Sequence, residues 1–315
     1  MGCMNTSHTP TLILHHYNES PYAEKIRAIL GYKGLAWQSV VVPMMMPKPD
    51  MTALTGGYRK VPVLQIGADV YCDTRLIARV LDKLTPAQPV MTEAGWSEVI
   101  AHWVDVNFFG KAVAHTFSQI VDFLSDEFLA DRAALSGMTG MSREAVKRSG
   151  PQTRQALECE LAWVEQGLKQ SQPFIGGETP SHGDFALYCA LWFVKVSRLD
   201  LSAYPATLAW MKRIKAYGQG TRSELAAQMA LDAARDAEPA PLDYEALTVV
   251  DPSGLQVGQR VAVRPEVMGQ ECVEGELIGL NATQLTLRLQ SERCGTVHVH
   301  FPRTGYRVKP LTNAS

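Results

Sequence analysis

Apolar positions near the start of the chain switch between the repeat of a strand and the repeat of a helix. Two apolar or β-branched runs, 12–17 and 37–42, predict strands, and Ile26 and Ile29 between them recur at helical spacing. A hairpin and a further amphipathic helix are predicted at 61–66, 70–72 and 76–84. The order βαβ followed by ββα predicts an α/β domain over residues 11–85.

The middle of the chain carries only helical patterns. Apolar side chains recur every three to four positions, most clearly over 92–109 and 152–170. A Gly/Pro-rich break precedes Ser181, which has the residue type and the place of a helix N-cap. We therefore predict an all-helical domain over residues 92–237. Its segment from Phe108 to Gly150 is longer and less regular than a plain helical hairpin.

The pattern changes again after Gly254, where apolar residues recur at every second position. Four or five short strands, separated by Gly, Asn or Ser, predict a small antiparallel β-barrel over residues 254–312 that resembles SH3-like modules in strand rhythm. A Pro-containing linker at 237–242 precedes it. We expect this barrel to pack on the helical domain of the same chain, and its sequence assigns it no ligand.

Composition limits the partners of this 315-residue chain. Both charge signs are well represented, the formal net charge is -2 and the pI is near 6.5. We therefore expect neither nucleic acid nor a membrane as a partner. The longest apolar run, Phe185–Val194, is about half as long as a membrane-spanning helix needs to be.

The cysteines and histidines indicate neither disulfides nor a metal site. Six cysteines are scattered without a CxxC pair, which favours reduced thiols and a cytoplasmic location. His298 and His300 share one face of a predicted strand but lack two further ligands, so we predict no metal. The first six residues fit the template for N-myristoylation, and a polar leader is the simpler explanation.

Ser20 is the first candidate for chemistry, because it follows a strand and begins a helix with Pro21. The free N–H groups and the dipole of a helix N-terminus stabilise an anion such as a thiolate. An ordinary thiol is only about 3% ionised at pH 7, and a drop of about two pKa units makes it roughly three-quarters ionised. A serine hydroxyl could donate a hydrogen bond to that thiolate. A simple N-cap is the alternative.

Two further segments suit a peptide-like ligand. Pro62 follows Lys60-Val61 and begins an edge strand or forms a cis turn. A cis bond would turn the backbone of Val61 toward a ligand. Asp73 offers a carboxylate to an ammonium group, whereas the hydroxyl of Thr74 and the adjacent helix N–H groups suit a carboxylate. For either residue alone, an N-cap is again the alternative.

Taken together, these segments resemble the glutathione S-transferase family over about residues 12–235. Ser-Pro-Tyr-Ala-Glu-Lys-Ile-Arg is similar to the active-site helix of the serine- and cysteine-type classes, such as zeta and omega. Lys-Val-Pro-Val-Leu resembles the family's cis-proline strand, and Asp-Thr resembles the pair that holds the γ-glutamyl group. Gly177, Ser181 and Asp184 resemble its helix-initiation capping box. The resemblance implies a thioredoxin-like domain followed by a helical domain.

The resemblance also implies roles for particular residues. Ser20 would activate the glutathione thiol, with Tyr17 as the runner-up. The remaining glutathione contacts would come from the Val61 backbone beside Pro62 for the cysteinyl part, from Asp73 and Thr74 for the γ-glutamyl end, and from Lys60 for the glycyl carboxylate. Ser181 and Asp184 would be structural.

The implied function is a glutathione-dependent transferase that conjugates or reduces a small electrophile, with glutathione as co-substrate. The alternative is a non-catalytic glutathione-transferase-like binding or regulatory protein, which the added β-barrel favours. The resemblance further implies a homodimer, in which the N-terminal domain of one subunit packs on the helical domain of the other.

Overall fold

The computed structural model describes residues 10–91, 95–137, 142–170, 173–242 and 253–311. The possible myristoylation pattern lies outside these residues. The N-terminal domain contains β1 (Ile13–His16), α1 (Pro21–Tyr32), β2 (Ala36–Val41), α2 (Pro49–Thr55), β3 (Val63–Ile66), β4 (Asp69–Cys72) and α3 (Thr74–Leu84). The sequence predicted all of these elements except α2.

The N-terminal sheet buries both of its faces. Strand β1 pairs in parallel with β2 and antiparallel with β3, and β3 pairs antiparallel with β4. Because side chains alternate along a strand, Leu12 and Leu14 pack with α1 and α3, whereas Ile13 packs on the opposite face with Met51 of α2. This three-layer arrangement is the thioredoxin-like domain that the sequence predicted.

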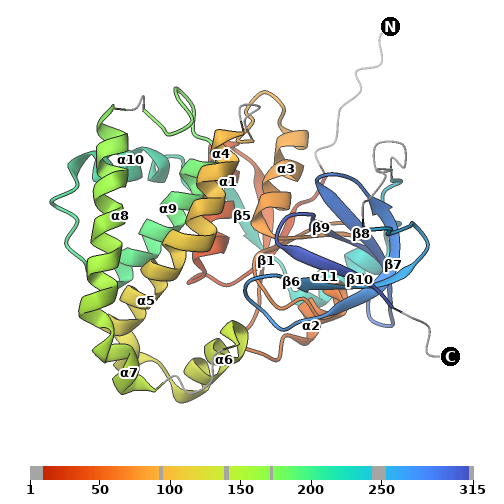
Figure 1. Ribbon diagram of the computed structural model, residues 1–315. Coiled ribbons are helices and arrows are strands. Elements are labelled where there is room, and N and C mark those ends of the chain that lie inside the picture. Colours follow the sequence, from red (N-terminus) through yellow and green to blue (C-terminus); the bar gives the residue numbers. More distant parts are fainter. Residues whose placement is uncertain (1–9, 92–94, 138–141, 171–172, 243–252, 312–315) are drawn as a thin grey trace, which may run out of the picture.

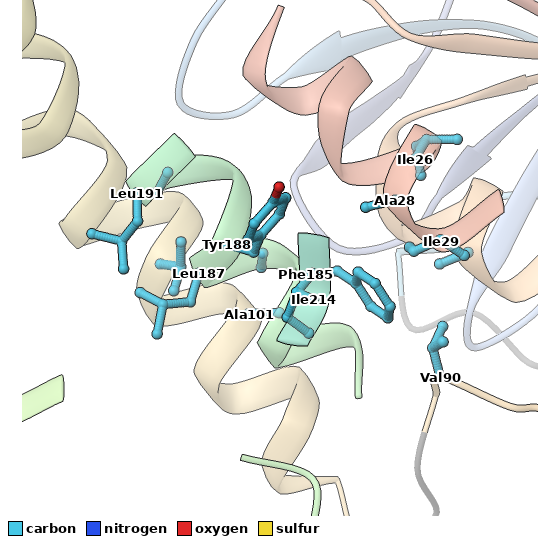
Figure 2. Close-up of a cluster of buried hydrophobic side chains, with 14 of the residues drawn as sticks. Ile26, Ala28, Ile29, Val90, Ala101, Phe185, Leu187, Tyr188, Leu191 and Ile214 are labelled. Atoms are coloured by element: carbon cyan, nitrogen blue, oxygen red, sulfur yellow. The ribbon is translucent and has the colours of Figure 1, made fainter. Parts of the chain in front are cut away.

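The helical domain follows and packs against α1 (Figure 1). Its main helices are α4 (Trp96–Trp103), a π-helical turn η1 (Val104–Phe108), α5 (Phe109–Ile120), α8 (Gly150–Gln170), α9 (His182–Val194), the 3-10 turn η3 (Lys195–Ser197) and α10 (Pro205–Lys215). Ala28 and Ile29 of α1 belong to one buried cluster with Phe185 and Tyr188 of α9 (Figure 2). A continuous apolar core therefore joins the two domains.

The segment between α5 and α8 is as irregular as its sequence suggested. It contains a 3-10 turn η2 (Val121–Phe123), α6 (Asp126–Ser136) and α7 (Arg143–Arg148). Helix α6 contacts the N-terminal domain, because Asp131 Oδ1 lies 2.6 Å from Arg59 Nη2 and Arg132 Nη2 donates to the Met44 carbonyl at 2.9 Å. This segment thus joins the helical domain to the connections on both sides of α2.

One part of the predicted helical stretch is a strand. Residues Thr221–Glu224 form β5, which pairs in parallel with the outer side of β2. The strand is mostly exposed and has no apolar repeat, so it could not be predicted from the sequence and is recognised only by its pairing with β2. Helix α11 (Ala227–Arg235) then packs with α2 on the same face of the sheet.

The C-terminal module, residues 253–311, consists of five strands. They are β6 (Arg260–Pro265), β7 (Val273–Leu280), β8 (Gln284–Ser291), β9 (Gly295–Pro302) and β10 (Tyr306–Pro310). Strands β6 to β9 form an antiparallel meander, and β10 pairs with β6.

The module joins the N-terminal sheet instead of packing mainly on the helical domain as expected, although the Gly269 N–H donates to the Leu135 carbonyl of α6 at 2.9 Å. Strand β9 pairs in parallel with β4, which gives a ten-stranded sheet in the order β10-β6-β7-β8-β9-β4-β3-β1-β2-β5. The unpaired backbone groups of an edge strand need a partner, and β9 supplies it for β4. Charged side chains on the two outer strands, such as Arg222 and Lys309, discourage further pairing.

Candidate functional site

The sheet register brings the predicted site segments to one edge. His15 of β1 lies opposite Val63 of β3, and Val63 lies opposite Cys72 of β4. The chain that leaves β1 toward Ser20, the chain that enters β3 at Pro62, and the chain that leaves β4 at Asp73 therefore share this edge. Three segments that are distant in sequence thus form one candidate site.

Ser20 is the N-cap of α1 and is 3% exposed. Its Oγ accepts a hydrogen bond from the Ala23 N–H at 3.2 Å. Because the cap uses a lone pair of the hydroxyl and not its hydrogen, Ser20 can still donate to an anion. Pro21 occupies the first helical turn, as expected. The geometry is compatible with both roles weighed for this residue, the cap and the donor.

Val61 and Pro62 are joined by a cis peptide bond. The bond lies directly before β3, at the edge that also carries Ser20. Lys60, on the N-terminal side, has its Nζ 3.9 Å from Glu271 Oε1 of the C-terminal module. Burial lowers the pKa of Lys60, whereas the nearby carboxylates of Glu271 and Asp73 act to raise it.

Asp73 is the N-cap of α3 and has a backbone conformation that is uncommon outside glycine. Its φ is 76°, and Arg198 is the only other non-glycine residue with a positive φ among the residues that the structure describes. Its Oδ1 accepts from the Arg75 N–H at 2.9 Å. Thr74, which begins the helix, is buried. A residue held in such a conformation often marks a functional site.

The C-terminal module contributes directly to this edge, which the sequence did not predict. The Tyr306 hydroxyl donates to Asp73 Oδ2 at 3.2 Å, and it lies 3.0 Å from the Tyr58 hydroxyl. Burial raises the pKa of both tyrosines well above the usual value. Local patterns could not reveal these contacts, because Tyr306 and Asp73 meet only through the pairing of β4 with β9.

Tyr17 and Lys48 lie together next to the Ser20 loop. Lys48 Nζ is 5.5 Å from the centre of the Tyr17 ring and donates to the Arg59 carbonyl at 3.0 Å. Burial, followed by the positive charges of Arg132 and Arg59, lowers the pKa of Lys48 to about 8. The sequence did not indicate a role for Lys48, since a single lysine between two prolines carries no distinctive signal.

The helical domain borders the site through α5 and the π-helical turn. The Tyr22 ring, in the first turn of α1, lies 4.7 Å from the Phe109 ring. Burial raises the pKa of Tyr22 well above the usual value, and the nearby carboxylate of Asp105 adds to this effect. Lys25 Nζ is fully buried and lies 3.9 Å from Asp105 Oδ2. Aromatic and acidic side chains therefore face the N-terminus of α1 across the domain boundary.

Asp184 organises the helical domain away from this edge. Its buried carboxylate accepts hydrogen bonds from five donors: the Ile175, Gly176 and Ser181 N–H groups, the Ser181 hydroxyl and Trp210 Nε1. Together, Ser181 and Asp184 form a capping box at the start of α9. These contacts have the geometry of the structural role that the sequence suggested.

His298 and His300 both face Asp69. Their nearest ring nitrogens lie 3.8 and 2.9 Å from Asp69 Oδ1, and Thr286 Oγ1 lies 2.9 Å from the other ring nitrogen of His300. Over the described ranges, no cluster of three His, Cys, Asp or Glu side chains has the arrangement of a metal site. No helix in that part of the chain has the length and apolarity needed to cross a membrane.

Comparison with known proteins identifies similar sequences and folds. The model of the glutathione S-transferase N-terminal domain matches residues 14–89, and that of the C-terminal domain matches residues 149–213. A GST-like protein from Pseudomonas syringae is 38% identical, with a TM-score of 0.76 over 96% of this chain and 100% of that chain. This likeness includes the C-terminal strands.

Two more distant structures match about two thirds of this chain. A tau class glutathione S-transferase from mango, Mangifera indica, is 18% identical, with a TM-score of 0.50 over 65% of this chain and 89% of that chain. A glutathione S-transferase from Rhodospirillum rubrum F11 is also 18% identical, with a TM-score of 0.53 over 65% of this chain and 88% of that chain. Both show a common fold. No curated protein matches the chain significantly.

Proposed function

Because this chain belongs to the glutathione S-transferase family, we propose that it is a glutathione-dependent transferase that conjugates or reduces a small electrophilic substrate. One observation carries this proposal: the sheet register gathers Ser20, the cis bond before Pro62, and Asp73 at one edge. We assign the protein to the serine-type, zeta- or omega-like group, on the basis of Ser20 and the residues that follow it in α1.

Ser20 is the group that stabilises the glutathione thiolate in this proposal. Its Oγ accepts from the Ala23 N–H, which leaves the hydroxyl hydrogen free to donate to sulfur. The N-terminus of the 12-residue helix α1 adds a favourable potential for an anion. Lowering the thiol pKa by about two units raises the thiolate fraction at pH 7 from about 3% to about three-quarters. The thiolate then attacks the electrophile.

The rest of glutathione would lie along the same edge. The Val61 backbone would pair with the cysteinyl part, and Asp73 and Thr74 would hold the γ-glutamyl end. Lys60 is the cation that the sequence suggests for the glycyl carboxylate. Lys48 is the better candidate, because it lies beside Tyr17 whereas Lys60 faces Glu271. The electrophile would bind on the helical-domain side of this edge, which Phe109 marks by its contact with Tyr22.

The ultraviolet absorbance of thiolate in bound glutathione tests this mechanism. Wild-type protein is expected to show the band near neutral pH, and Ser20→Ala is expected to lose most of it while still binding glutathione. Tyr17→Phe, the matched hydroxyl deletion, is expected to keep the band. Loss of the band in Tyr17→Phe alone would transfer the catalytic role to Tyr17. If wild-type protein binds glutathione but shows no thiolate absorbance, the proposed stabilisation of the thiolate is wrong.

A non-catalytic glutathione-binding or regulatory protein is the second candidate. The observation that favours it is the hydrogen bond from the Tyr306 hydroxyl to Asp73, because the added module thereby contacts the site. Turnover of halides, epoxides, quinones, disulfides or peroxides with glutathione distinguishes the two candidates. Absence of turnover on every class, together with tight glutathione binding, would favour the regulatory protein.

We further propose that the C-terminal module is SH3-like, that the protein is cytoplasmic, and that it forms a homodimer. The return of β10 to pair with β6 beside a β6–β9 meander supports the first of these. Exposed apolar residues along α4 and η1 support the dimer: Trp96, Val99 and Val106 are 72%, 55% and 45% exposed. They are spaced so that they share one face of the helix.

A further inference from the structure

Glu271 is a buried carboxylate whose two oxygens both lack a hydrogen-bond donor. Its side chain is 4% exposed, and neither Oε1 nor Oε2 has a hydrogen-bond partner in the portion of the chain that the structure describes. The closest cation, Lys60 Nζ, lies 3.9 Å from Oε1, which is too far for a hydrogen bond. A carboxylate in this state is costly unless something else binds it.

Among the described residues, Lys60 is the only cation within ion-pair distance of Glu271. Glu271 and Asp73 both act on the half-buried Lys60 ammonium, so these two carboxylates share one cation. Arg75, the next cation along the chain, pairs instead with Glu98, with its Nε 3.3 Å from Glu98 Oε2. A second cation would balance this set, and an ammonium group would also bring three hydrogen-bond donors.

The module positions Asp73 as well as contributing Glu271. Tyr306, at the start of β10, donates to Asp73 Oδ2, and its ring lies 6.0 Å from Lys60 Nζ. The Tyr58 hydroxyl completes the chain of contacts by lying 3.0 Å from the Tyr306 hydroxyl. Segments from both ends of the protein therefore meet around the γ-glutamyl end of the proposed glutathione site.

We infer that the C-terminal module completes the glutathione site, with Glu271 binding the α-ammonium of the γ-glutamyl residue and Tyr306 positioning Asp73. This inference rests on the glutathione function proposed above. Glutathione supplies the missing cation and the missing donors in one group. The role of the added module is then to select a ligand with a free amino group.

The test compares glutathione with glutaryl-cysteinyl-glycine, which lacks only the α-amino group. Calorimetric titration of wild type is expected to show glutathione binding at least about tenfold more tightly than the analogue. Glu271→Gln is expected to reduce that preference by about tenfold, mainly by weakening glutathione binding. Glu274→Gln, an exposed carboxylate three residues away, is the control and is expected to keep the wild-type preference.

A second variant covers the case in which Glu271→Gln does not fold. Lys60→Met removes the shared cation, so the preference for glutathione over the analogue is expected to rise. An unchanged or smaller preference in this variant would overturn the inference. The inference would also be overturned by a wild-type protein that binds both ligands equally, or by a Glu271→Gln variant that keeps the wild-type preference or weakens the binding of both ligands alike. Wild type that binds no glutathione at millimolar concentration would overturn the proposed function itself, and this inference with it.

Discussion

His15 and His16, adjacent on β1, are both buried as neutral imidazoles. His15 Nε2 lies 2.8 Å from Gln65 Oε1, and the Gln65 amide nitrogen already donates to two carbonyls, so the histidine must be the donor. His16 Nδ1 lies 3.0 Å from Arg27 Nη1, which can only donate, so its Nε2 carries the hydrogen toward Ser39. Burial lowers the pKa of both histidines from 6.5 to about 4.

These histidines are expected to make the protein acid-sensitive. Between pH 6.5 and about 4 the unfolded chain binds protons that the folded chain does not, so the free energy of unfolding falls as the pH falls. Each histidine contributes a slope of up to about 1.4 kcal/mol per pH unit in that window. Urea unfolding at several pH values measures the slope, and His15→Gln, which retains a donor for Gln65, should lower it by up to about 1.4 kcal/mol per pH unit.

The comparison between His15→Gln and wild type separates the contribution of His15 to the pH dependence of stability from the contributions of other titratable groups. Burial raises the pKa of Glu24, which favours the folded state as the pH falls and thus acts in the opposite direction. Equal slopes in wild type and His15→Gln would show that His15 already titrates normally in the folded protein.

The pairing of β4 with β9 is the contact that attaches the C-terminal module. Asp69, the first residue of β4, accepts from His300 Nε2 at 2.9 Å and from the Ala240 N–H at 2.7 Å. The Tyr71 ring stacks on the His300 ring, with 4.4 Å between centroids. One buried carboxylate therefore binds both β9 and the chain that leads to the module.

Asp69→Asn is expected to loosen this contact without unfolding the helical domain. The amide nitrogen of asparagine cannot accept, so either His300 or Ala240 loses its partner, at a cost of about 1–3 kcal/mol. Native-state hydrogen exchange should then be faster in β4 and β9 and unchanged in α8 and α9. Glu292→Gln, exposed in the turn between β8 and β9, is the control. Equal acceleration in the helices would mean that the module does not open separately.

Elements with a distinct apolar pattern could be predicted from the sequence, and elements without one could not. Strands β1, β3 and β4 are buried on both faces, so short apolar runs bounded by loop residues are sufficient to find them. Strand β5, with the sequence Thr-Arg-Ser-Glu, exists only because β2 offers it an edge. The pairing of β4 with β9 depends on residues far apart in sequence, which no local pattern encodes.

The candidate site divides in the same way. Ser20, Pro62 and Asp73 each follow or precede a strand, and their residue types are chemically distinctive at such positions. Glu271 and Lys48 are ordinary surface residue types in sequence, and only burial by distant segments makes them unusual. The contribution of the C-terminal module to the site therefore depends on tertiary packing and could not be predicted from the sequence.

At the scale of the whole molecule, the extended sheet constrains how two copies can pair. The outer side of β4 is already occupied by β9, so a second subunit cannot add a strand there. The apolar face formed by Trp96, Val99 and Val106 on α4 and η1 is exposed, and it belongs to the helical domain. A dimer that covers this face agrees with the domain-on-domain contact inferred from the family resemblance.

Val99→Glu is expected to convert the dimer into a monomer, because it places a charge in the centre of that face. Light scattering on the full chain measures the change in mass. If the substitution only weakens the dimer, about hundredfold dilution of the variant should yield the monomer. Trp163→Glu alters an apolar residue of α8 that is 63% exposed, and the protein should remain dimeric. A monomeric wild type would exclude the dimer, and a dimeric Val99→Glu would move the contact elsewhere.

The long sheet has a consequence for the newly made chain. Asp69 and its partner His300 are 231 residues apart. At a synthesis rate of about 5–20 residues per second, the β4 edge waits on the order of 10–50 s for its partner strand to emerge from the ribosome. An open strand edge is a template for other chains during that time. Nascent copies on a crowded polysome therefore compete with β9 for β4, and slower translation of the last third of the message lengthens that competition.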